Sequence, residues 1–198
     1  MEKLTDESLY KDGEEEFGSV SSIFYSFLSK FLRRNYAEID SDLRSERFKT
    51  LLDVGCGPGN LDILLAESHP EATLYCVDPS PAMLSIAKGR ISRANLEERI
   101  TASLGSSRNI PFEGKFDVII SSFSYHHWNR RDDSLNFLAS RLNNGGLIAI
   151  YEYHTSQGLF STSHGISDAN WASLELSGFE KQVYRRSRMI ILKLRATI

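Results

Sequence analysis

Residues 51–60 read Leu-Leu-Asp-Val-Gly-Cys-Gly-Pro-Gly-Asn, and this stretch decides the fold. Its apolar first half predicts a short strand, and the glycines at positions 55, 57 and 59 predict a tight turn into a helix. A helix that begins at such a turn presents backbone N–H groups to a ligand. No Lys follows the glycines, so this is not the phosphate loop, and the spacing also differs from the G-x-G-x-x-G of dinucleotide sites.

The chain around this stretch alternates between strand-like and helix-like patterns. Short apolar runs predict strands at 50–54, 73–77, 100–104, 116–122 and 147–153, and then 179–184 and 189–196, joined by a hairpin turn at 185–188. Apolar residues at three- and four-residue steps predict four helices. The first ends near Ser68, and the second begins at Pro81 after the N-cap Ser80. The third runs from Asp132 or Asp133 to Leu142 before a stop at 143–146, and the fourth follows the N-cap Ser167. This order predicts an α/β fold with a mostly parallel sheet and one antiparallel strand.

The segment before the first strand carries a different pattern. Residues 1–18 are charged and contain glycine, and apolar residues at helical steps then predict a helix from Ser19, its N-cap, to about Ala37. Residues 38–49 are polar and predict a second short helix or a connector. We expect 1–49 to form an N-terminal tail and a helix that packs on the core or acts as a lid, and 50–198 to form the main domain.

Composition restricts the class of protein. A chain of 198 residues with 41% hydrophobic and 25% charged residues suits one globular domain, and its net charge of −3 does not favour nucleic acid as a partner. The two cysteines, Cys56 and Cys76, form neither a disulfide framework nor a C-x-x-C pair for zinc. With an acidic, polar opening and no apolar run long enough for a membrane span, we expect a cytoplasmic protein with reduced, buried thiols.

Acidic residues stand at the ends of two predicted strands. Asp53 precedes the first glycine, and Asp78 ends the second strand. Ligands of doubly wound sheets bind beyond the carboxyl ends of the strands, where a carboxylate on the second strand can accept hydrogen bonds from both hydroxyls of a ribose. Both nicotinamide and S-adenosylmethionine (SAM) sites use this arrangement, so Asp78 alone does not distinguish them, and it is also placed to cap a helix.

Several motifs, taken together and in order, resemble the class I SAM-dependent methyltransferases of the small-molecule type, similar to methyltransferase families 11 and 25. They are Asp53–Gly59, Asp78–Leu84, Phe116–Ser122 with Tyr125-His126-His127, Leu142–Leu147, and Gly178-Phe179 before the closing hairpin. The resemblance covers residues 50–198. It implies a Rossmann-like, doubly wound, seven-stranded sheet with helices on both faces.

The resemblance also implies SAM as cofactor and S-adenosylhomocysteine (SAH) as product. It places against the cofactor Asp53, Gly55, Cys56, Gly57, Gly59, Asp78, Pro79, Met83, Ser106, Ser107, Ser121 and Ser122. Asp53, Gly55 and Gly57 would face the methionine part, and Asp78 would hold the ribose. The serines at 106 and 107 stand where related proteins often have an Asp that receives the adenine amino group, and serine accepts a hydrogen bond less strongly than a carboxylate.

Methyl transfer from SAM depends mainly on positioning, because the sulfonium already activates the methyl group. A general base is needed only when the acceptor arrives protonated. The candidate catalytic residues are Tyr125, His126, His127 and His154, with Glu152 as a further candidate base. Because His126 and His127 are adjacent and point in different directions, we expect only one to face the site and predict no metal.

The sequence therefore predicts a methyltransferase acting on a small molecule by in-line transfer to an O, N or C nucleophile, with no membrane partner. Three alternatives stay open: an RNA- or protein-modifying methyltransferase, a SAM-binding module without catalysis, and a nicotinamide-dependent dehydrogenase, which the glycine spacing disfavours. The basic residues at 185–188, with Lys181 and Lys193, form either a solvated turn or a contact for RNA or another anionic surface.

Overall fold

The computed structural model describes residues 22–154 and 168–197, with side chains from residue 32 onward except those of 168–170. Its helices are α2 (Ser22–Leu43), α3 (Asn60–Ser68), α4 (Pro81–Arg93), the 3-10 turn η1 (Tyr125–His127), α5 (Arg131–Ser140) and α6 (Asp168–Ser173). Its strands are β1 (Thr50–Val54), β2 (Thr73–Asp78), β3 (Ile100–Leu104), β4 (Phe116–Ser122), β5 (Leu142–Tyr153), β6 (Phe179–Arg186) and β7 (Met189–Ala196).

The strands form one sheet in the order β3-β2-β1-β4-β5-β7-β6. β1 to β5 pair in parallel, so that Leu52 of β1 lies opposite Tyr75 of β2 and Ile119 of β4. β7 runs antiparallel to both β5 and β6. The strand order reverses between β1 and β4, which places the switch point of the sheet beside the glycine loop. The predicted seven-stranded, mostly parallel sheet is confirmed.

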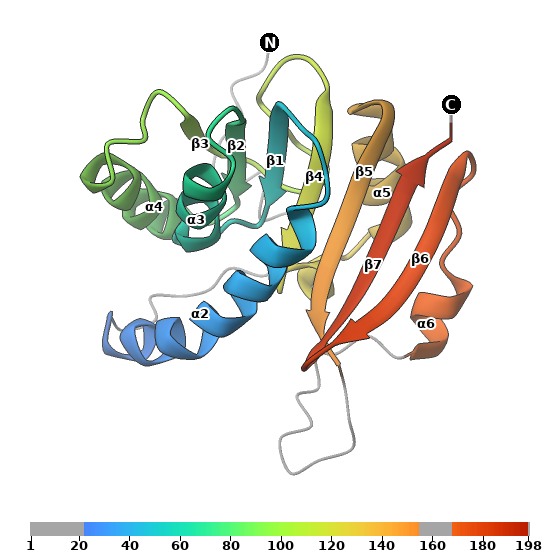
Figure 1. The fold of residues 1–198 in the computed structure, drawn as a ribbon, viewed down its shortest axis with the longest axis horizontal. Coiled ribbons are helices and arrows are strands. Elements are labelled where there is room, and N and C mark those ends of the chain that lie inside the picture. The colour runs from blue at the N-terminus through green and yellow to red at the C-terminus, as the bar shows by residue number, and fades with distance from the viewer. Residues whose placement is uncertain (1–21, 155–167, 198) are drawn as a thin grey trace.

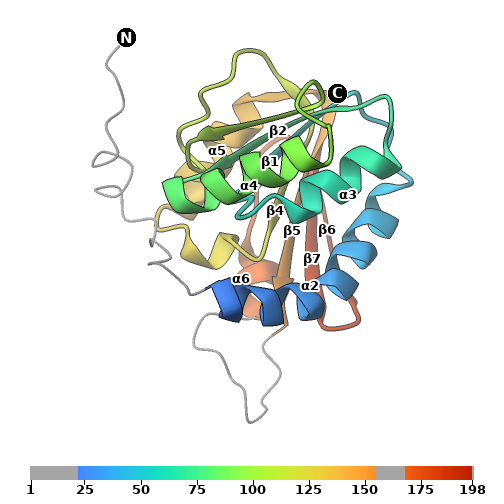
Figure 2. The ribbon, with the colours of Figure 1, turned by 90° about the vertical axis from the view of Figure 1, so that its left-hand side faces the viewer.

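Helices cover both faces of this sheet (Figures 1 and 2). On one face, Leu43 of α2, Leu65 of α3 and Leu84 of α4 join a core cluster with Leu51 of β1. On the other face, α5 and α6 pack in a second cluster with Leu52, the next residue of β1. Successive residues of a strand point to opposite faces of the sheet. Because helices cover both faces, β1 is buried on each side. This doubly wound arrangement was predicted.

The α2 helix is fixed to the sheet by polar as well as apolar contacts. Asn35 donates to the Tyr153 hydroxyl at 3.0 Å, and Asp42 accepts from the Tyr151 hydroxyl at 3.0 Å. Lys193 of β7 lies 3.1 Å from Asp42. Ile39 is fully buried, so the apolar stripe of the helix continues beyond Ala37. The predicted end of this helix at about residue 37 is therefore wrong. The predicted cap Ser19 lies outside the described residues, and the lid role stays a prediction.

Two other predicted boundaries differ from the structure. The α5 helix ends at Ser140, and β5 begins at Leu142, so that residues 143–146 belong to an irregular start of the strand rather than to a helix stop. The closing turn is tighter than predicted, because Arg185 and Arg186 pair with β7 and only two residues make the turn. Ser187 adopts the positive φ of 53° that this turn requires. The predicted cap Ser167 lies outside the described residues. No helix among those described is long and apolar enough to cross a membrane.

Candidate active site at the carboxyl edge of the sheet

The glycine loop after β1 adopts a backbone conformation that residues with a side chain rarely adopt. Gly55, Gly57 and Gly59 have φ values of 83°, 54° and 74°, in the left-handed region. The amides of Gly55 and Cys56 both donate to the Val77 carbonyl, at 2.8 and 3.0 Å, which fixes the loop to the end of β2. Among the residues that the structure describes, a Cβ atom on Gly57 would meet nothing within 4 Å, which leaves space over the middle of the loop.

The loop also contacts the segment that follows β4. A Cβ atom on Gly55 would lie 2.3 Å from the Ser124 hydroxyl oxygen. That hydroxyl donates to the Val54 carbonyl at 2.8 Å and lies 2.7 Å from the Ser121 hydroxyl. Ser124 therefore joins two strand ends across the switch point. The sequence reading did not single it out, because no local pattern relates it to position 54, 70 residues earlier.

Asp78 is anchored at the end of β2 by backbone donors. One carboxylate oxygen accepts from the Gly57 amide at 2.8 Å and the other from the Ser80 amide at 2.9 Å. The Ser80 hydroxyl in turn accepts from the Met83 amide and caps α4, as predicted. These bonds orient the Asp78 carboxylate between the glycine loop and the start of α4. Ribose binding and capping, the two roles considered for this residue, are geometrically compatible.

A pair of buried carboxyl groups lies beneath the loop. Asp53 and Asp62 are both 0% exposed, and no oxygen of either finds a hydrogen-bond partner among the described residues. Burial, with the charges of Asp62 and Asp78 adding to it, raises the pKa of Asp53 well above its usual value. Burial likewise raises the pKa of Asp62 to about 7. The predicted contact of Asp53 with the methionine part of SAM stays a prediction.

Asp62 is a second residue that the sequence reading missed. An acidic residue in the first turn of a helix is usually exposed, where it stabilises the positive end of the helix dipole. In α3 this residue instead faces the interior and the two thiols. Only the packing of α3 on β1 and β2 shows this.

The serines predicted near the adenine occupy different environments. Ser106 bridges to Asn109 through backbone bonds in the turn after β3. Ser107 is fully buried, and its hydroxyl lies 2.8 Å from that of Ser134 on α5. Pro79 and Met83 lie at the start of α4, and Ser121 and Ser122 end β4. The elements thus bring every predicted cofactor residue to one edge of the sheet, while their contacts with SAM stay predictions.

Among the candidate catalytic residues, His126 has a defined partner. Its Nδ1 lies 3.0 Å from both carboxylate oxygens of Glu152, and its amide donates to the same side chain at 3.1 Å. Glu152 is the penultimate residue of β5 and is 2% exposed. Arg131 donates to the carbonyls of Tyr125 and His126, which fixes the η1 turn that carries the histidine. A carboxylate facing Nδ1 favours the tautomer with Nδ1–H and directs the basic Nε2 outward.

Of the other candidates, Tyr125 is less suited to accept a proton. Tyr125 is 2% exposed, and burial raises its pKa to about 12. Its ring packs against Trp128 and Trp171 in an aromatic cluster. The His127 ring lies 3.9 Å from the His126 ring, which corrects the expectation that the two diverge. His154 donates its amide to the Arg188 carbonyl beyond β5.

A strained residue separates β4 from η1. Phe123 has a φ of 56°, and its ring stacks on Tyr153 at 4.5 Å between centroids. A bulky residue with positive φ costs about 1–3 kcal/mol and persists only where the surroundings impose it.

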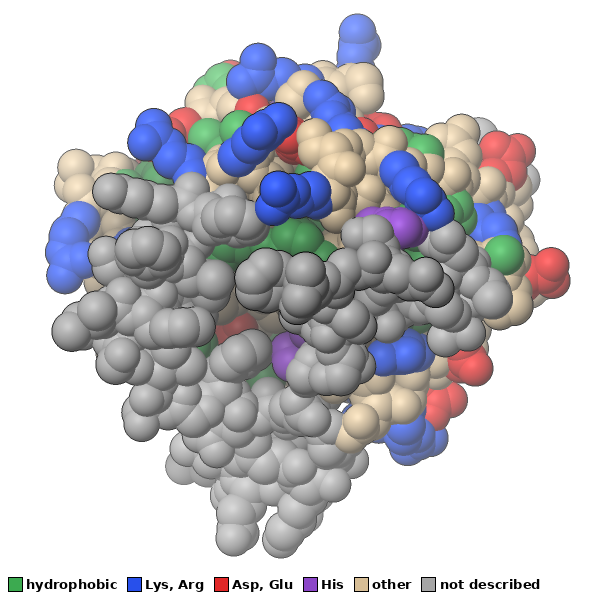
Figure 3. Space-filling view, turned by 90° about the horizontal axis from the view of Figure 1, so that it is seen from below, with side chains coloured by type: hydrophobic (Ala, Val, Ile, Leu, Met, Phe, Trp, Pro, Cys, Tyr) green, Lys and Arg blue, Asp and Glu red, His purple; other side chains and the backbone are tan. Residues whose placement is uncertain are grey.

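Figure 3 views the molecule onto the edge where β5 ends, and histidine and hydrophobic side chains reach the surface there.

Comparisons with known proteins agree with this geometry. Residues 51–146 match a family model described as a methyltransferase domain. The trans-aconitate 2-methyltransferase of Mycobacterium marinum is 32% identical over 117 residues, and the malonyl-[acyl-carrier protein] O-methyltransferase of Acetivibrio thermocellus is 31% identical over 108. A solved structure, PigF with SAH, superimposes with a TM-score of 0.71 at 20% identity and covers 87% of this chain and 57% of that one. In sequence over residues 51–146, and in fold, the chain resembles the class I SAM-dependent methyltransferases.

The chain spans only part of the length of the curated relatives that it matches. The two alignments cover 59% and 54% of the chain but 41% and 37% of the relatives. Its basic residues near the closing hairpin make internal contacts: Arg186 donates to Ser41 on α2, and Lys181 donates to the Ala172 and Leu174 carbonyls. Lys193 is 11% exposed and pairs with acidic groups of the N-terminal segment. These contacts weigh against a basic surface for RNA.

Proposed function

We propose that the protein transfers a methyl group from SAM to a small-molecule acceptor. The observation that carries the proposal is the anchoring of Asp78 against an open glycine loop. The carboxylate is held 2.8 Å from the Gly57 amide, and no atom of the described residues fills the space over Gly57. An oriented carboxylate beside an open, positive-φ loop suits a nucleoside whose chain passes over the loop.

The residues present fit SAM as the cofactor. A Cβ atom on Gly57 would project into open space, and the N-terminus of α3 at Gly59 has no side-chain cap. Gly55, Gly57 and Gly59 would hold the methionine part, and Asp78 the ribose, since a carboxylate offers about four acceptor positions. When bound, SAM supplies an activated methyl group on a sulfonium. The protein's share of the reaction is to orient and, where needed, to move a proton.

We assign proton removal to the pair formed by His126 and Glu152. Nε2 of His126 accepts a proton from the acceptor, and Glu152 stabilises the imidazolium through Nδ1–H. An alcohol, phenol or ammonium group needs this step, whereas an ionised carboxylate does not. The pair therefore favours a hydroxyl or amine acceptor.

The names of the curated relatives suggest first acceptors to test. A cavity of about 660 Å³ lies beside η1, but its lining includes neither His126 nor any residue assigned to SAM, so it does not locate the acceptor. The curated relatives are named for trans-aconitate and for malonyl-acyl carrier protein, which provide first probes. Three of the basic residues near the closing hairpin, Lys181, Arg186 and Lys193, bond within the protein.

Calorimetric titration with SAH tests the cofactor assignment. We expect Asp78→Ala to weaken SAH binding at least about tenfold, because hydrogen bonds to charged groups contribute about 1.5–3 kcal/mol each. Asp117→Ala is a matched control, since this carboxylate also accepts two backbone amides, at 2.8 and 3.0 Å, but at the opposite edge of the sheet. No SAH binding by the wild type, or equal weakening by both variants, would contradict the assignment.

Turnover tests the acceptor and the base. SAH release is measured with trans-aconitate, malonyl-acyl carrier protein and a panel of alcohols, phenols and amines. With a hydroxyl or amine acceptor, we expect His126→Gln to lower kcat about 10²–10⁴-fold while SAH affinity stays unchanged. Glu152→Gln should shift the pH profile of kcat. SAH binding without release from any acceptor would indicate a binding module instead, and equal turnover by His126→Gln would refute the base.

A further inference from the structure

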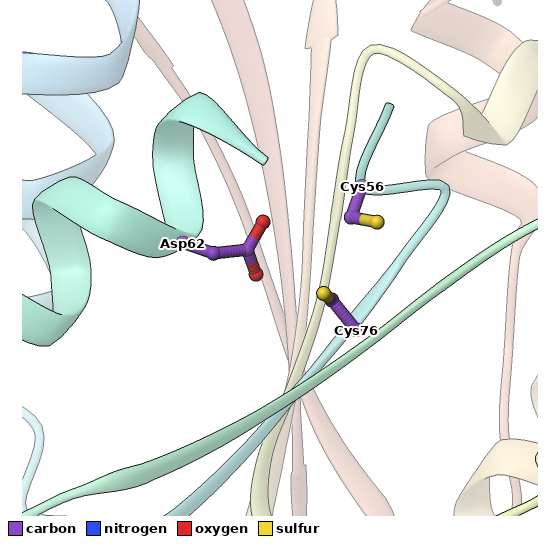
Figure 4. Close-up of side chains that lie close together, drawn as sticks. All are labelled: Cys56, Asp62 and Cys76. Carbon is purple, nitrogen blue, oxygen red and sulfur yellow. The ribbon is translucent and has the colours of Figure 1, made fainter. Parts of the chain in front are cut away.

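A cluster of metal-binding side chains lies beneath the cofactor loop. Cys56 of the loop, Asp62 of α3 and Cys76 of β2 offer two sulfurs and a carboxylate oxygen that all lie within 4.8 Å of one another. All three side chains are buried. Figure 4 shows the Asp62 carboxylate projecting from α3 toward the two thiols. Three elements thus converge on one small interior space.

A second observation indicates that this space is made for a ligand. Both oxygens of Asp62 are buried and lack a hydrogen-bond partner among the described residues, as do both oxygens of Asp53. A buried carboxyl group that makes no hydrogen bond costs free energy, and native proteins rarely leave two such groups side by side. The register pairs Asp53 with Cys76 across β1 and β2, so the two side chains lie on the same face of the sheet.

We propose that Cys56, Cys76 and Asp62 bind a zinc ion. Two thiolates with carboxylate oxygens are a donor set for Zn²⁺, which is borderline-soft and prefers four tetrahedral ligands in structural sites. Hard cations such as Mg²⁺ and Ca²⁺ are disfavoured, since they take oxygen ligands.

Such an ion would join the glycine loop to the first turn of α3 and to β2 from below. Gly57 directly follows the ligand Cys56 in the chain, and Asp78 lies two residues after the ligand Cys76. The ion would therefore stabilise the loop conformation without contacting the acceptor. This site goes beyond the proposed methyl transfer, and its test needs neither SAM nor an acceptor.

The test is a titration of the full chain with Co²⁺ and then Zn²⁺, anaerobically and with the thiols reduced. We expect one Co²⁺ per chain, with thiolate-to-cobalt absorption and the strong visible bands of a tetrahedral site, and displacement of Co²⁺ by Zn²⁺. Cys76→Ser and Asp62→Asn should each weaken Zn²⁺ binding at least about 100-fold, since loss of an outer partner alone costs 10–100-fold. Asp133→Asn is the control, since this carboxylate is 51% exposed and lies on α5. The Zn²⁺ affinity of this variant should equal that of the wild type.

X-ray absorption of the zinc-loaded wild type gives a readout that does not depend on variants folding. We expect two sulfur ligands at about 2.3 Å. The proposal is overturned if the reduced wild type shows no thiolate-to-cobalt absorption, or if folded Cys76→Ser binds Zn²⁺ as tightly as the wild type does. It is also overturned if X-ray absorption of the zinc-loaded protein shows fewer than two sulfur ligands.

Discussion

Gly55→Ala tests how the glycine loop is held at the switch point. Gly55 has a φ of 83°, and a Cβ atom there would lie 2.3 Å from Oγ and 2.5 Å from Cβ of Ser124. Because the Ser124 Cβ is itself too close, a rotamer change does not relieve the overlap, and the segment after β4 must move. That movement breaks the hydrogen bond from Ser124 to the Val54 carbonyl and its contact with Ser121.

The expected cost follows from these terms. A left-handed conformation costs an alanine about 1–2 kcal/mol, and two net hydrogen bonds contribute about 1 kcal/mol each. We expect Gly55→Ala to lower the free energy of unfolding by about 3–4 kcal/mol. Gly57→Ala is the matched control, because its φ is also positive but its Cβ would meet nothing within 4 Å. It should cost only the conformational term of about 1–2 kcal/mol.

Urea denaturation of the two variants measures this difference, and calorimetry with SAH adds a second readout. Gly57→Ala should weaken SAH binding more than its loss of stability accounts for, because its methyl group enters the space over the loop. In Gly55→Ala with Ser124→Gly, the overlap is removed, so the double variant should be about 2 kcal/mol more stable than the sum of the single changes predicts. Equal destabilisation by Gly55→Ala and Gly57→Ala, or strict additivity in the double variant, would refute the reasoning.

Two further predictions concern carboxylates outside the loop. Asp42→Asn leaves Lys193 without one of its buried partners, and we expect a loss of about 3 kcal/mol and a lower Tm in thermal denaturation; an unchanged Tm would mean that α2 is only loosely docked. For Asp117, burial acts to raise the pKa, but hydrogen bonds from Lys49, Asn143 and Thr50 outweigh it and lower the pKa. Its contribution to stability is therefore complete above about pH 4 and lost as the pH falls through the lowered pKa. When the pH is lowered, the free energy of unfolding of Asp117→Asn should fall less than that of the wild type. An equal fall in both proteins would contradict this.

The backbone of the glycine loop and the elements beside it were largely predictable from local sequence. Positive φ was predictable at Gly55, Gly57 and Gly59, because a strand that turns directly into a helix needs such backbone. The Ser80 cap was predictable because capping depends on neighbours within three residues. The strand-end position of Asp78 followed from the apolar run before it.

Errors occurred where tertiary packing decides a boundary. α2 continues to Leu43 because Ile39 and Leu43 pack on the sheet, although the residues around them are polar. Residues 143–146 lie within β5 as an irregular segment, because Leu142 pairs with Phe116 and Leu147 with Val118 of β4 on either side of it, despite two glycines that are typical of a turn. In both places, contacts with distant strands outweigh local preference.

The sequence by itself determined the order of the elements, the parallel sheet and the edge at which the acidic strand ends meet. These follow from periodicity and glycine placement, which act over a few residues. Only the tertiary structure decided which side chains act together. His126 meets Glu152 26 residues away, Ser124 closes on the loop 70 residues before it, and Asp62 turns inward toward Cys56 and Cys76. Such pairs depend on how helices and strands pack across the switch point, and no local pattern in the chain encodes that packing.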